Sequence, residues 1–445
     1  MVVVVVLVVL VVVALVVAAH WYVWRRLVRD TAREGGVARR VGTVAAFVLP
    51  VLAVGAATVG RVGAPFWLQR LVAWPGYLWL AVLMYLLLAL LVGEAVRPLL
   101  RRYVDGRAQA VDAEGGARAG ARAESDVQPQ TRTTATEPVE QPVTASAGSA
   151  GSGGAQTGAV ITGQAPPAAT VPSRRLFVSR VVAGAAATVA AGTVGYGTYG
   201  VLRGPRVKRI TVPLAKLPRA AHGYRIAVVS DIHLGPILGR AHTQRIVDTI
   251  NSTRPDLIAV VGDLVDGTVE DLGPAAVPLA GLDAPHGAFF VTGNHEYFSG
   301  AREWVDHVRE LGLRPLVNER VEIAGFDLAG VNDIAGESEG DGPDFAKALG
   351  DRDRARASVL LAHQPVVIHD AVRHGVDLQL SGHTHGGQLW PGNYLAELAN
   401  PTVAGLERYG DTQLYVTRGA GAWGPPVRVG APSDITVVEL ASRQA

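Results

Sequence analysis

Long apolar runs dominate the first hundred residues of the chain. Residues 1–19 are almost entirely Val, Leu and Ala, the apolar character continues to Trp24, and two further apolar stretches cover roughly 41–60 and 71–93. Each run is long enough to cross a bilayer, because about 20 apolar residues in a helix span the hydrocarbon core. The pattern predicts three transmembrane helices within a membrane region at residues 1–104. The first run lacks the basic start and cleavage site of a signal peptide, so we expect a retained anchor, with a misplaced start codon as the alternative.

A polar segment and a fourth apolar run follow. Residues 105–172 are rich in Ala, Gly, Ser, Thr and Pro with almost no aromatic residues, a composition that predicts a disordered linker. Residues 173–204 begin with Ser-Arg-Arg-Leu-Phe-Val and continue as a Gly- and Ala-rich apolar run. This segment resembles a twin-arginine export signal and equally fits an ordinary fourth span. Both interpretations leave the Arg pair inside and residues from about 205 outside.

The distribution of Arg residues between these runs predicts an orientation. The first connection holds Arg25, Arg26, Arg29, Arg33, Arg39 and Arg40, and the third run is followed by Arg97, Arg101, Arg102 and Arg107. The connection between the second and third runs holds only Arg61 and Arg70. Arg-rich connections stay in the cytoplasm. We therefore expect a multi-pass protein of the cell membrane whose C-terminal half lies on the extracytoplasmic side.

Residues 205–445 have a different pattern, in which short apolar runs alternate with amphipathic segments. The apolar runs cover residues 225–230, 256–261, 287–292, 358–362 and 376–381. Continuous apolar runs of this length are typical of buried strands. Helical patterns lie between some of them, at 241–252, 300–312 and 366–374. The alternation predicts an α/β domain in this part of the chain.

Composition narrows the function classes. The net charge is only +2, so the chain lacks the clustered basic face of a nucleic-acid-binding protein, and we expect no nucleic-acid partner. The chain contains no Cys, which excludes disulfides and thiolate metal sites. A metal site in this chain must therefore use oxygen and imidazole ligands.

Five polar motifs close the predicted strands of the C-terminal domain. They are Asp231-Ile-His233, Gly262-Asp263, Gly293-Asn294-His295-Glu296, His363 and Gly382-His383-Thr384-His385. Asp-x-His and Gly-Asp alone are more often turns or helix caps, and a lone His pair is more often structural. Five motifs in order at strand ends indicate a site, since α/β sheets bind ligands there. The motifs hold seven candidate ligands, too many for one ion and suited to two ions that share a bridge. Carboxylate, amide and imidazole together favour divalent Mn, Fe, Zn or Co.

The order of these motifs resembles the calcineurin-like metallophosphoesterase superfamily over about residues 222–440. Gly386-Gly387-Gln388, Thr417-Arg418-Gly419 and Pro425-Pro426-Val427-Arg428 are similar to the bacterial membrane-associated, exported branch. The resemblance implies a two-sheet sandwich flanked by helices (αββα), here preceded by transmembrane helices. We expect residues 264–286 and 332–357, which lie between the motifs, to shape the pocket.

The resemblance also implies a role for each motif residue. It implies two metal sites with a shared carboxylate: Asp231, His233 and His385 at the first, Asn294, His363 and His383 at the second, and Asp263 as the bridge. His295 would be a catalytic residue that faces the substrate. Glu296 would be the acidic residue that orients His295.

The expected function is that of a membrane-tethered, dinuclear metal-dependent phosphoesterase. It would hydrolyse phosphate mono- or diesters of cell-envelope lipids by attack of a hydroxide that the two ions share. One alternative is a nucleotide or cyclic-nucleotide phosphodiesterase. Another, of a different class, is a non-catalytic metal-binding membrane receptor or scaffold, which would be expected to lose ligands that this chain retains. The expected partners are the bilayer and a phosphate ester; the sequence leaves the oligomeric state open.

Overall fold

The computed structural model describes residues 2–125 and 174–444. Their contacts form two compact units. The larger consists of Met1–Val92 and Ala183–Ala445, and the smaller is Gly93–Val182. The larger unit contains the C-terminal α/β domain, which we call the sandwich domain, together with most of the apolar helices.

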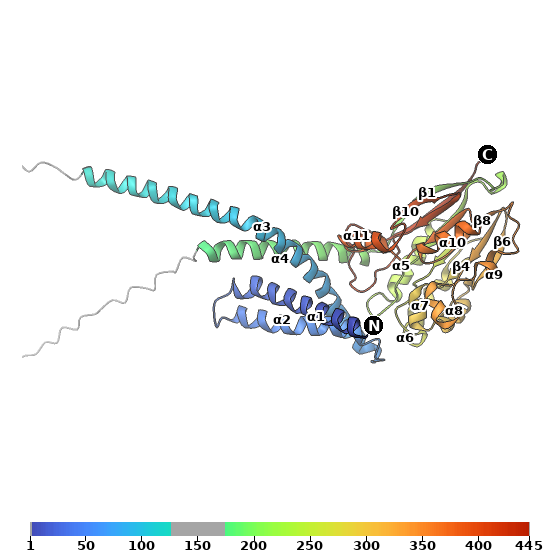
Figure 1. Ribbon diagram of the computed structural model, residues 1–445, viewed down its shortest axis with the longest axis horizontal. Coiled ribbons are helices and arrows are strands. Elements are labelled where there is room, and N and C mark those ends of the chain that lie inside the picture. Colours follow the sequence, from blue (N-terminus) through green and yellow to red (C-terminus); the bar gives the residue numbers. More distant parts are fainter. Residues whose placement is uncertain (1, 126–173, 445) are drawn as a thin grey trace, which may run out of the picture. The chain divides into compact units, whose positions relative to one another are not determined.

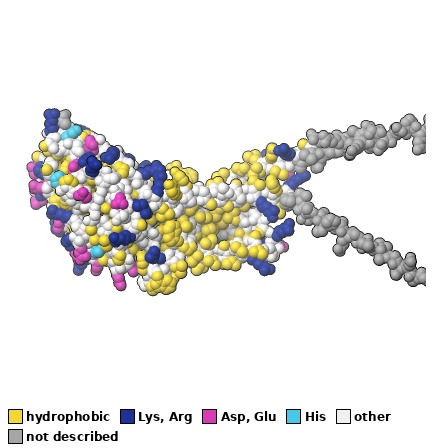
Figure 2. All heavy atoms as spheres, turned by 180° about the vertical axis from the view of Figure 1, so that it is seen from behind, with side chains coloured by type: hydrophobic (Ala, Val, Ile, Leu, Met, Phe, Trp, Pro, Cys, Tyr) yellow, Lys and Arg dark blue, Asp and Glu magenta, His cyan; other side chains and the backbone are white. Residues whose placement is uncertain are grey.

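The predicted apolar runs are helices. They are α1 (Val2–Trp24), α2 (Val37–Thr58), α3 (Phe66–Ser125) and α4 (Arg174–Leu202), and a π-helical turn at Arg25–Arg29 follows α1. Each of the four contains a stretch long and apolar enough to cross a membrane. Hydrophobic side chains cover much of this helical part and basic side chains lie at its end, whereas most acidic side chains lie on the sandwich domain (Figure 2). An apolar surface of this extent is favourable in lipid and unfavourable in water.

Helix α3 is longer than the apolar pattern predicts. The pattern ends its span near residue 93 and assigns no stable structure to residues 105–172, whereas α3 continues to Ser125. Residues 105–125 are rich in Ala, which favours helix, and an existing helix extends without a second nucleation step. The remainder of the predicted linker, residues 126–172, lies outside the described residues.

The sandwich domain contains two six-stranded sheets that lie face to face (Figure 1). The first has the order β1-β12-β2-β3-β4-β5, and its strands β2 to β5 are parallel. Its strands are β1 (Arg206–Leu214), β2 (Tyr224–Val229), β3 (Leu257–Val261), β4 (Ala288–Val291), β5 (Arg314–Pro315) and β12 (Asp434–Ser442). Three of the five predicted strands are β2, β3 and β4, and the other two belong to the second sheet, as β8 (Ala357–Leu361) and β9 (Leu378–Ser381).

The second sheet has the order β10-β11-β9-β8-β7-β6. Its strands are β6 (Glu319–Ile323), β7 (Phe326–Gly330), β8 (Ala357–Leu361), β9 (Leu378–Ser381), β10 (Gly405–Tyr409) and β11 (Thr412–Val416). Strands β7, β8, β9 and β11 are parallel neighbours. The predicted α/β two-sheet sandwich is confirmed.

Helices cover the outer faces of both sheets. They are α5 (Arg240–Ser252), α6 (Val269–Ala276) and α8 (Ala301–Glu310) on the first sheet, and α9 (Phe345–Leu349) and α10 (Ile368–Arg373) on the second. Two further short helices are α7 (Asn294–Ser299) and α11 (Gly392–Ala399). Alternate residues of a strand point to opposite faces, so Ile226 of β2 lies in the core between the sheets and Ala227 lies against the helices. The strands read as continuous apolar runs because both of their faces are buried.

The apolar helices of the larger unit contact the sandwich domain directly. The buried cluster of α1, α3 and α4 includes Val427, and Leu389 packs against it. The hydroxyl of Tyr85 in α3 donates a hydrogen bond to the carbonyl oxygen of Trp390, at 2.9 Å. Phe66, the first residue of α3, packs on the helix-covered face of the first sheet. The apolar helices of the larger unit therefore pack against the sandwich domain.

Candidate metal centre

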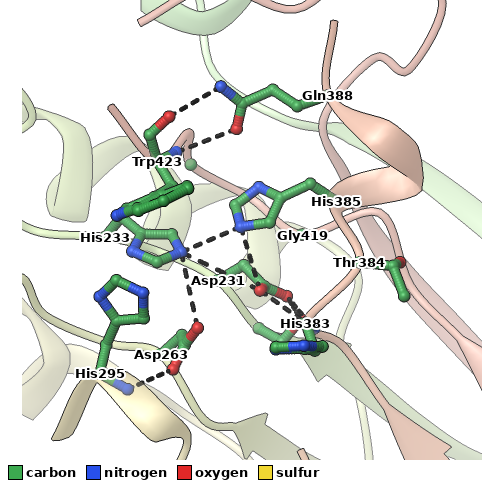
Figure 3. A network of polar contacts seen from close by, with 12 residues as sticks. Asp231, His233, Asp263, His295, His383, Thr384, His385, Gln388, Gly419 and Trp423 are labelled. Carbon is green, nitrogen blue, oxygen red and sulfur yellow. Dashed lines mark hydrogen bonds and ion pairs between the residues drawn. The ribbon is translucent and has the colours of Figure 1, made fainter. Parts of the chain in front are cut away.

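The five sequence motifs meet at one edge of the sandwich. Asp231 follows β2, Asp263 follows β3 and Asn294 begins α7 after β4, all in the first sheet. The motifs that follow β8 and β9 come from the second sheet. Carboxyl ends of parallel strands lie at the same edge of a sheet, which brings side chains from distant sequence positions together (Figure 3).

The first group of candidate ligands is Asp231, His233 and His385, whose ligand atoms all lie within 4.8 Å of one another. The Nε2 atoms of His233 and His385 are 3.0 Å apart, and that of His385 is 3.3 Å from an Asp231 oxygen. All three residues are buried. A carboxylate and two ring nitrogens that converge away from water fit a divalent cation.

The second group is Asp263, His363 and His383. His363 donates from Nδ1 to the carbonyl oxygen of Val261 at 2.9 Å, which leaves the lone pair of a neutral ring on Nε2. That buried nitrogen faces an Asp263 oxygen at 3.0 Å and has no hydrogen-bond partner among the described residues. Two acceptors that face each other require a cation between them, either a proton or a metal ion. Asn294 adds its Oδ1 atom, 3.1 Å from Nδ1 of His383.

In the absence of metal ions the pKa values reflect this demand for positive charge. Burial lowers the pKa of His363, but the carboxylates, Asp263 above all, raise it well above its ordinary value. Burial raises the pKa of Asp263, but the charge and hydrogen bond of His363 and the charges of His233 and His295 together hold it well below its ordinary value. Metal binding would replace these protons, as ligand histidines bind metal in their neutral form.

The backbone at this edge is unusual. Asp231, His233, Asp263, His383 and His385 have φ values of 51°, 49°, 53°, 71° and 52°. This left-handed region is unfavourable for residues other than glycine, and such strain concentrates at functional sites. The strain supports a functional site at the motifs rather than ordinary turns.

Glycines let the motif loops approach closely. Gly262 has a φ of +73°, and a Cβ atom there would lie 2.6 Å from Nδ1 of His363. A Cβ atom on Gly293 would overlap the carboxylate of Asp263. The glycines of these two motifs are therefore required by the packing of the candidate ligands.

Asp266 is a site residue that the sequence analysis missed. One of its oxygens lies 2.7 Å from Nδ1 of His295 and 2.9 Å from Nδ1 of His233. Burial raises the pKa of Asp266, yet His233 and His295 lower it to about 2. Burial lowers the pKa of His233, and Asp266 together with the other carboxylates raises it to about 9. The signal was present in Gly262-Asp263-Leu264-Val265-Asp266-Gly267, where two carboxylates lie three residues apart on one turn.

The contacts of Glu296 in the structure differ from those that its expected role of orienting His295 requires. Its carboxylate is fully buried and accepts hydrogen bonds from the backbone N–H groups of Gly293, Asp263 and Leu264, at 2.6–2.9 Å. Glu296 therefore joins the loops after β3 and β4, and the carboxylate on the His295 ring is that of Asp266. Adjacent side chains on a helix point in different directions, so Glu296 turns inward where His295 turns toward the pocket.

His295 lies at the mouth of the centre. Its side chain is 14% exposed, and its ring packs edge-on against His233, Phe298 and Trp423. The third group of possible ligands, His233, Asp266 and His295, is accounted for by the two hydrogen bonds to Asp266. The ring of His295 is therefore placed to contact a bound substrate.

The comparisons with known proteins agree with this geometry. Residues 224–387 match the family model described as Calcineurin-like phosphoesterase. The chain is 38% identical to a transmembrane protein with metallophosphoesterase domain of Danio rerio, over 54% of this chain and 59% of that one. It is 38% identical to an uncharacterized metallophosphoesterase of Helicobacter pylori, over 54% of this chain and 65% of that one. An uncharacterized metallophosphoesterase of Aquifex aeolicus is 35% identical over 53% of this chain and 91% of its own length.

The matched region therefore spans less than two thirds of the Danio rerio and Helicobacter pylori relatives. It spans nearly the whole Aquifex aeolicus relative. Among solved structures, a dimetal phosphatase of Danio rerio is similar at 12% identity and a TM-score of 0.34, over 49% of this chain and 93% of that one.

Proposed function

This chain belongs to the calcineurin-like phosphoesterase family of metal-dependent phosphoester hydrolases, and we propose that it acts at a membrane on phosphate esters of cell-envelope lipids. The observation that carries this proposal is a pocket of about 510 Å³ beside the candidate metal centre. His233, Asp266 and His295 form one wall. The opposite wall comes from the ends of α2 and α3.

The wall contributed by the helices is mostly apolar. Its side chains include Ala56, Val59, Phe66, Ala73, Tyr77 and Leu80. Pockets of this kind bind a ligand through apolar contacts and orient it with a few polar groups. We infer that the phosphate of the substrate lies at the imidazole and carboxylate wall and its apolar part lies along α2 and α3.

The candidate ligands fit two divalent ions. Asp231, His233 and His385 would hold one ion, Asn294, His363 and His383 the other, and Asp263 both. When bound, the ions would supply an activated water and neutralise charge on the phosphate. The metal identity stays open among Mn, Fe and Zn, since all of them accept imidazole and carboxylate ligands.

His295 would act directly on the ester, and Asp266 would orient the ring of His295. Asp266 accepts a hydrogen bond from Nδ1 of His295, which fixes the plane of the ring and leaves Nε2 for the substrate. A proton held on that nitrogen can be donated to the leaving oxygen, a step typically worth about 10²–10⁴-fold in rate.

We place the sandwich domain on the extracytoplasmic side. The support is that the pocket wall includes Gly60 and Arg61 of the Arg-poor connection between α2 and α3, whereas the Arg-rich connections are expected in the cytoplasm. Alkaline phosphatase fused after residue 205 should be active, because this enzyme folds only after export. Strong activity of a cytoplasm-only reporter at that point would reverse the orientation.

The substrate assay compares a lipid phosphate with a soluble one. The metal-loaded full chain in detergent micelles should hydrolyse a lipid phosphate with a higher kcat/KM than p-nitrophenyl phosphate. Phe66→Ala removes a side chain of the pocket wall and should lower kcat/KM for the lipid at least tenfold, since an aromatic ring that the lipid buries contributes about 1.5–3 kcal/mol.

Trp67→Ala is the matched control, because Trp67 is 67% exposed and does not line the pocket. It should leave both substrates unaffected. Equal losses for the lipid and the soluble ester, or faster hydrolysis of the soluble ester by the unmodified chain, would exclude a lipid substrate.

A nucleotide or cyclic nucleotide is the second candidate substrate. Phe298 and Trp423 are 74% and 54% exposed beside His295, where their rings could stack on a base. Inclusion of 5′- and cyclic nucleotides in the same assay decides between the two classes.

A further inference from the structure

A second hollow, separate from the metal centre, runs along α4. Its volume is about 440 Å³, and one wall is a single face of α4 with Arg203 just beyond the end of the helix: Gly192, Thr193, Tyr196, Tyr199, Gly200 and Arg203. The opposite wall is the backbone-rich segment from Arg428 to Ser433. The lining part of α4 covers eleven residue steps, or roughly 16 Å along the helix axis. We call this hollow the α4 trough.

The two ends of the α4 trough differ in chemistry. Toward the middle of α4 it is lined by Gly192 and Thr193, within a stretch apolar enough to cross a membrane. At the end of the helix it is lined by Arg203 and Arg206, both exposed. Within residues 2–125 and 174–444, neither guanidinium has a carboxylate partner. Unpaired arginines at the end of an apolar helix attract anions at a membrane surface.

Aromatic and basic neighbours reinforce this arrangement. Tyr196 and Tyr199 are 72% and 61% exposed, as is usual for tyrosines at a membrane interface. The guanidinium of Arg203 lies over the ring of Tyr199, at 5.8 Å from its centroid. No acidic residue is among the described residues that line the trough. Its outer end therefore carries positive charge only.

We propose that the α4 trough binds an anionic phospholipid, with the phosphate at Arg203 and Arg206 and an acyl chain along Gly192 to Gly200. A free phosphate would use only the basic end and would leave the apolar length of the trough exposed. A phospholipid matches both parts of the trough. Its charged headgroup would lie at the basic end, and its acyl chain would lie along the apolar length. The site is distinct from the substrate pocket, which lies beside His295.

The test measures binding of short-chain lipids to the full chain in neutral detergent by calorimetry. Dihexanoyl-phosphatidylglycerol should bind at least tenfold more tightly than dihexanoyl-phosphatidylcholine. Arg203→Gln with Arg206→Gln should remove that difference, because each basic residue near a membrane surface contributes to anionic-lipid affinity. Arg209→Gln with Arg219→Gln removes the same charge from exposed positions outside the trough and should keep it.

A second variant tests the apolar part without a change of charge. A side chain at Gly200 would enter open space, since no atom lies within 4 Å of its ideal Cβ position. Gly200→Leu should therefore fold, fill the trough and weaken both lipids several-fold. All variants should keep the rate on a soluble phosphate ester, which shows that they are folded.

Three results would overturn the proposal: equal affinity for the two lipids, affinity unchanged in the Arg203 and Arg206 variant, or binding unchanged by Gly200→Leu. In a further outcome, inorganic phosphate binds as tightly as dihexanoyl-phosphatidylglycerol and loses affinity equally in the Arg203 and Arg206 variant. That result would show an anion site rather than a lipid site. The binding measurement is made after removal of metal with a chelator, so no lipid is hydrolysed and a failure of the proposed lipid substrate leaves the result intact.

Discussion

The metal centre and the apolar helices are constructed in opposite ways. At the centre, polar side chains such as Asp231 and His363 are buried on the ends of rigid strands, and the backbone is held in strained conformations. In the helices, apolar side chains such as Leu7 and Leu15 are more than 60% exposed, and the contacts are distributed over many residues. The metal centre therefore depends on the positions of individual atoms, whereas the helix surface depends on the overall hydrophobicity of many side chains. Single substitutions should therefore have large effects at the centre and small effects in the helices.

The largest effect should come from the shared carboxylate. Asp263→Asn should reduce the metal content from two ions per chain to less than one, and should lower turnover by more than the 10–100-fold typical of losing an outer-shell partner. Removal of metal with a chelator should abolish turnover in the unmodified chain. His233→Ala is the comparison, since it should retain more of the second ion. Elemental analysis that finds one ion at full activity would contradict the dinuclear centre.

His295→Ala separates catalysis from metal binding. We expect metal content to stay at the level of the unmodified chain and turnover to fall on the order of 10²-fold or more, because the variant lacks a proton donor for the leaving oxygen. A loss of metal in proportion to activity would show instead that His295 is a ligand.

Asp266→Asn should have an intermediate effect. The amide is a weaker acceptor than the carboxylate for Nδ1 of His295 and of His233, so kcat measured at saturating metal should fall roughly 10–100-fold and the affinity for the first ion should fall as well. In the His295→Ala background the same substitution should cost much less, because the two residues act as a pair. Additive losses in the double variant would show that Asp266 acts independently of His295.

Glu296→Gln should act on stability more than on turnover. One oxygen of Glu296 accepts from two backbone N–H groups and the other from a third, and an amide nitrogen cannot accept. Loss of charged, buried hydrogen bonds is expected to cost about 2 kcal/mol. Thermal unfolding of the full chain measures the loss. A variant as stable as the parent would show that this carboxylate does not join the two loops.

The smallest effect should come from the contact between α3 and the sandwich domain. Tyr85→Phe removes one hydrogen bond, to the carbonyl oxygen of Trp390, and should lower the free energy of unfolding by about 1 kcal/mol at unchanged activity. A tenfold loss of turnover would contradict the expectation that single substitutions in the apolar helices have small effects. It would show that one hydrogen bond from α3 affects the activity of the metal centre.

Much of the fold follows from local patterns. The apolar stretches predicted α1, α2 and the core of α3 and α4, and the five apolar runs predicted the strands that carry the motifs. The prediction was wrong for residues 105–125, where α3 continues, because polar composition alone does not indicate whether an existing helix extends. The assignment of seven candidate ligands to two ions stays a prediction, and the structure supports it by grouping Asp231 with His233 and Asp263 with His363.

The sequence by itself determined which segments are apolar enough to span a membrane, which form buried strands and which residues can act as ligands, because these properties depend on neighbours in the chain. Only the tertiary structure decided that Asp266, and not Glu296, binds His295, since that choice depends on the direction of each side chain after the strands pack. It also decided that residues 56–80 share a pocket with His233 and Trp423. No local pattern encodes a contact between residues more than a hundred positions apart, because such contacts arise from the packing of whole elements.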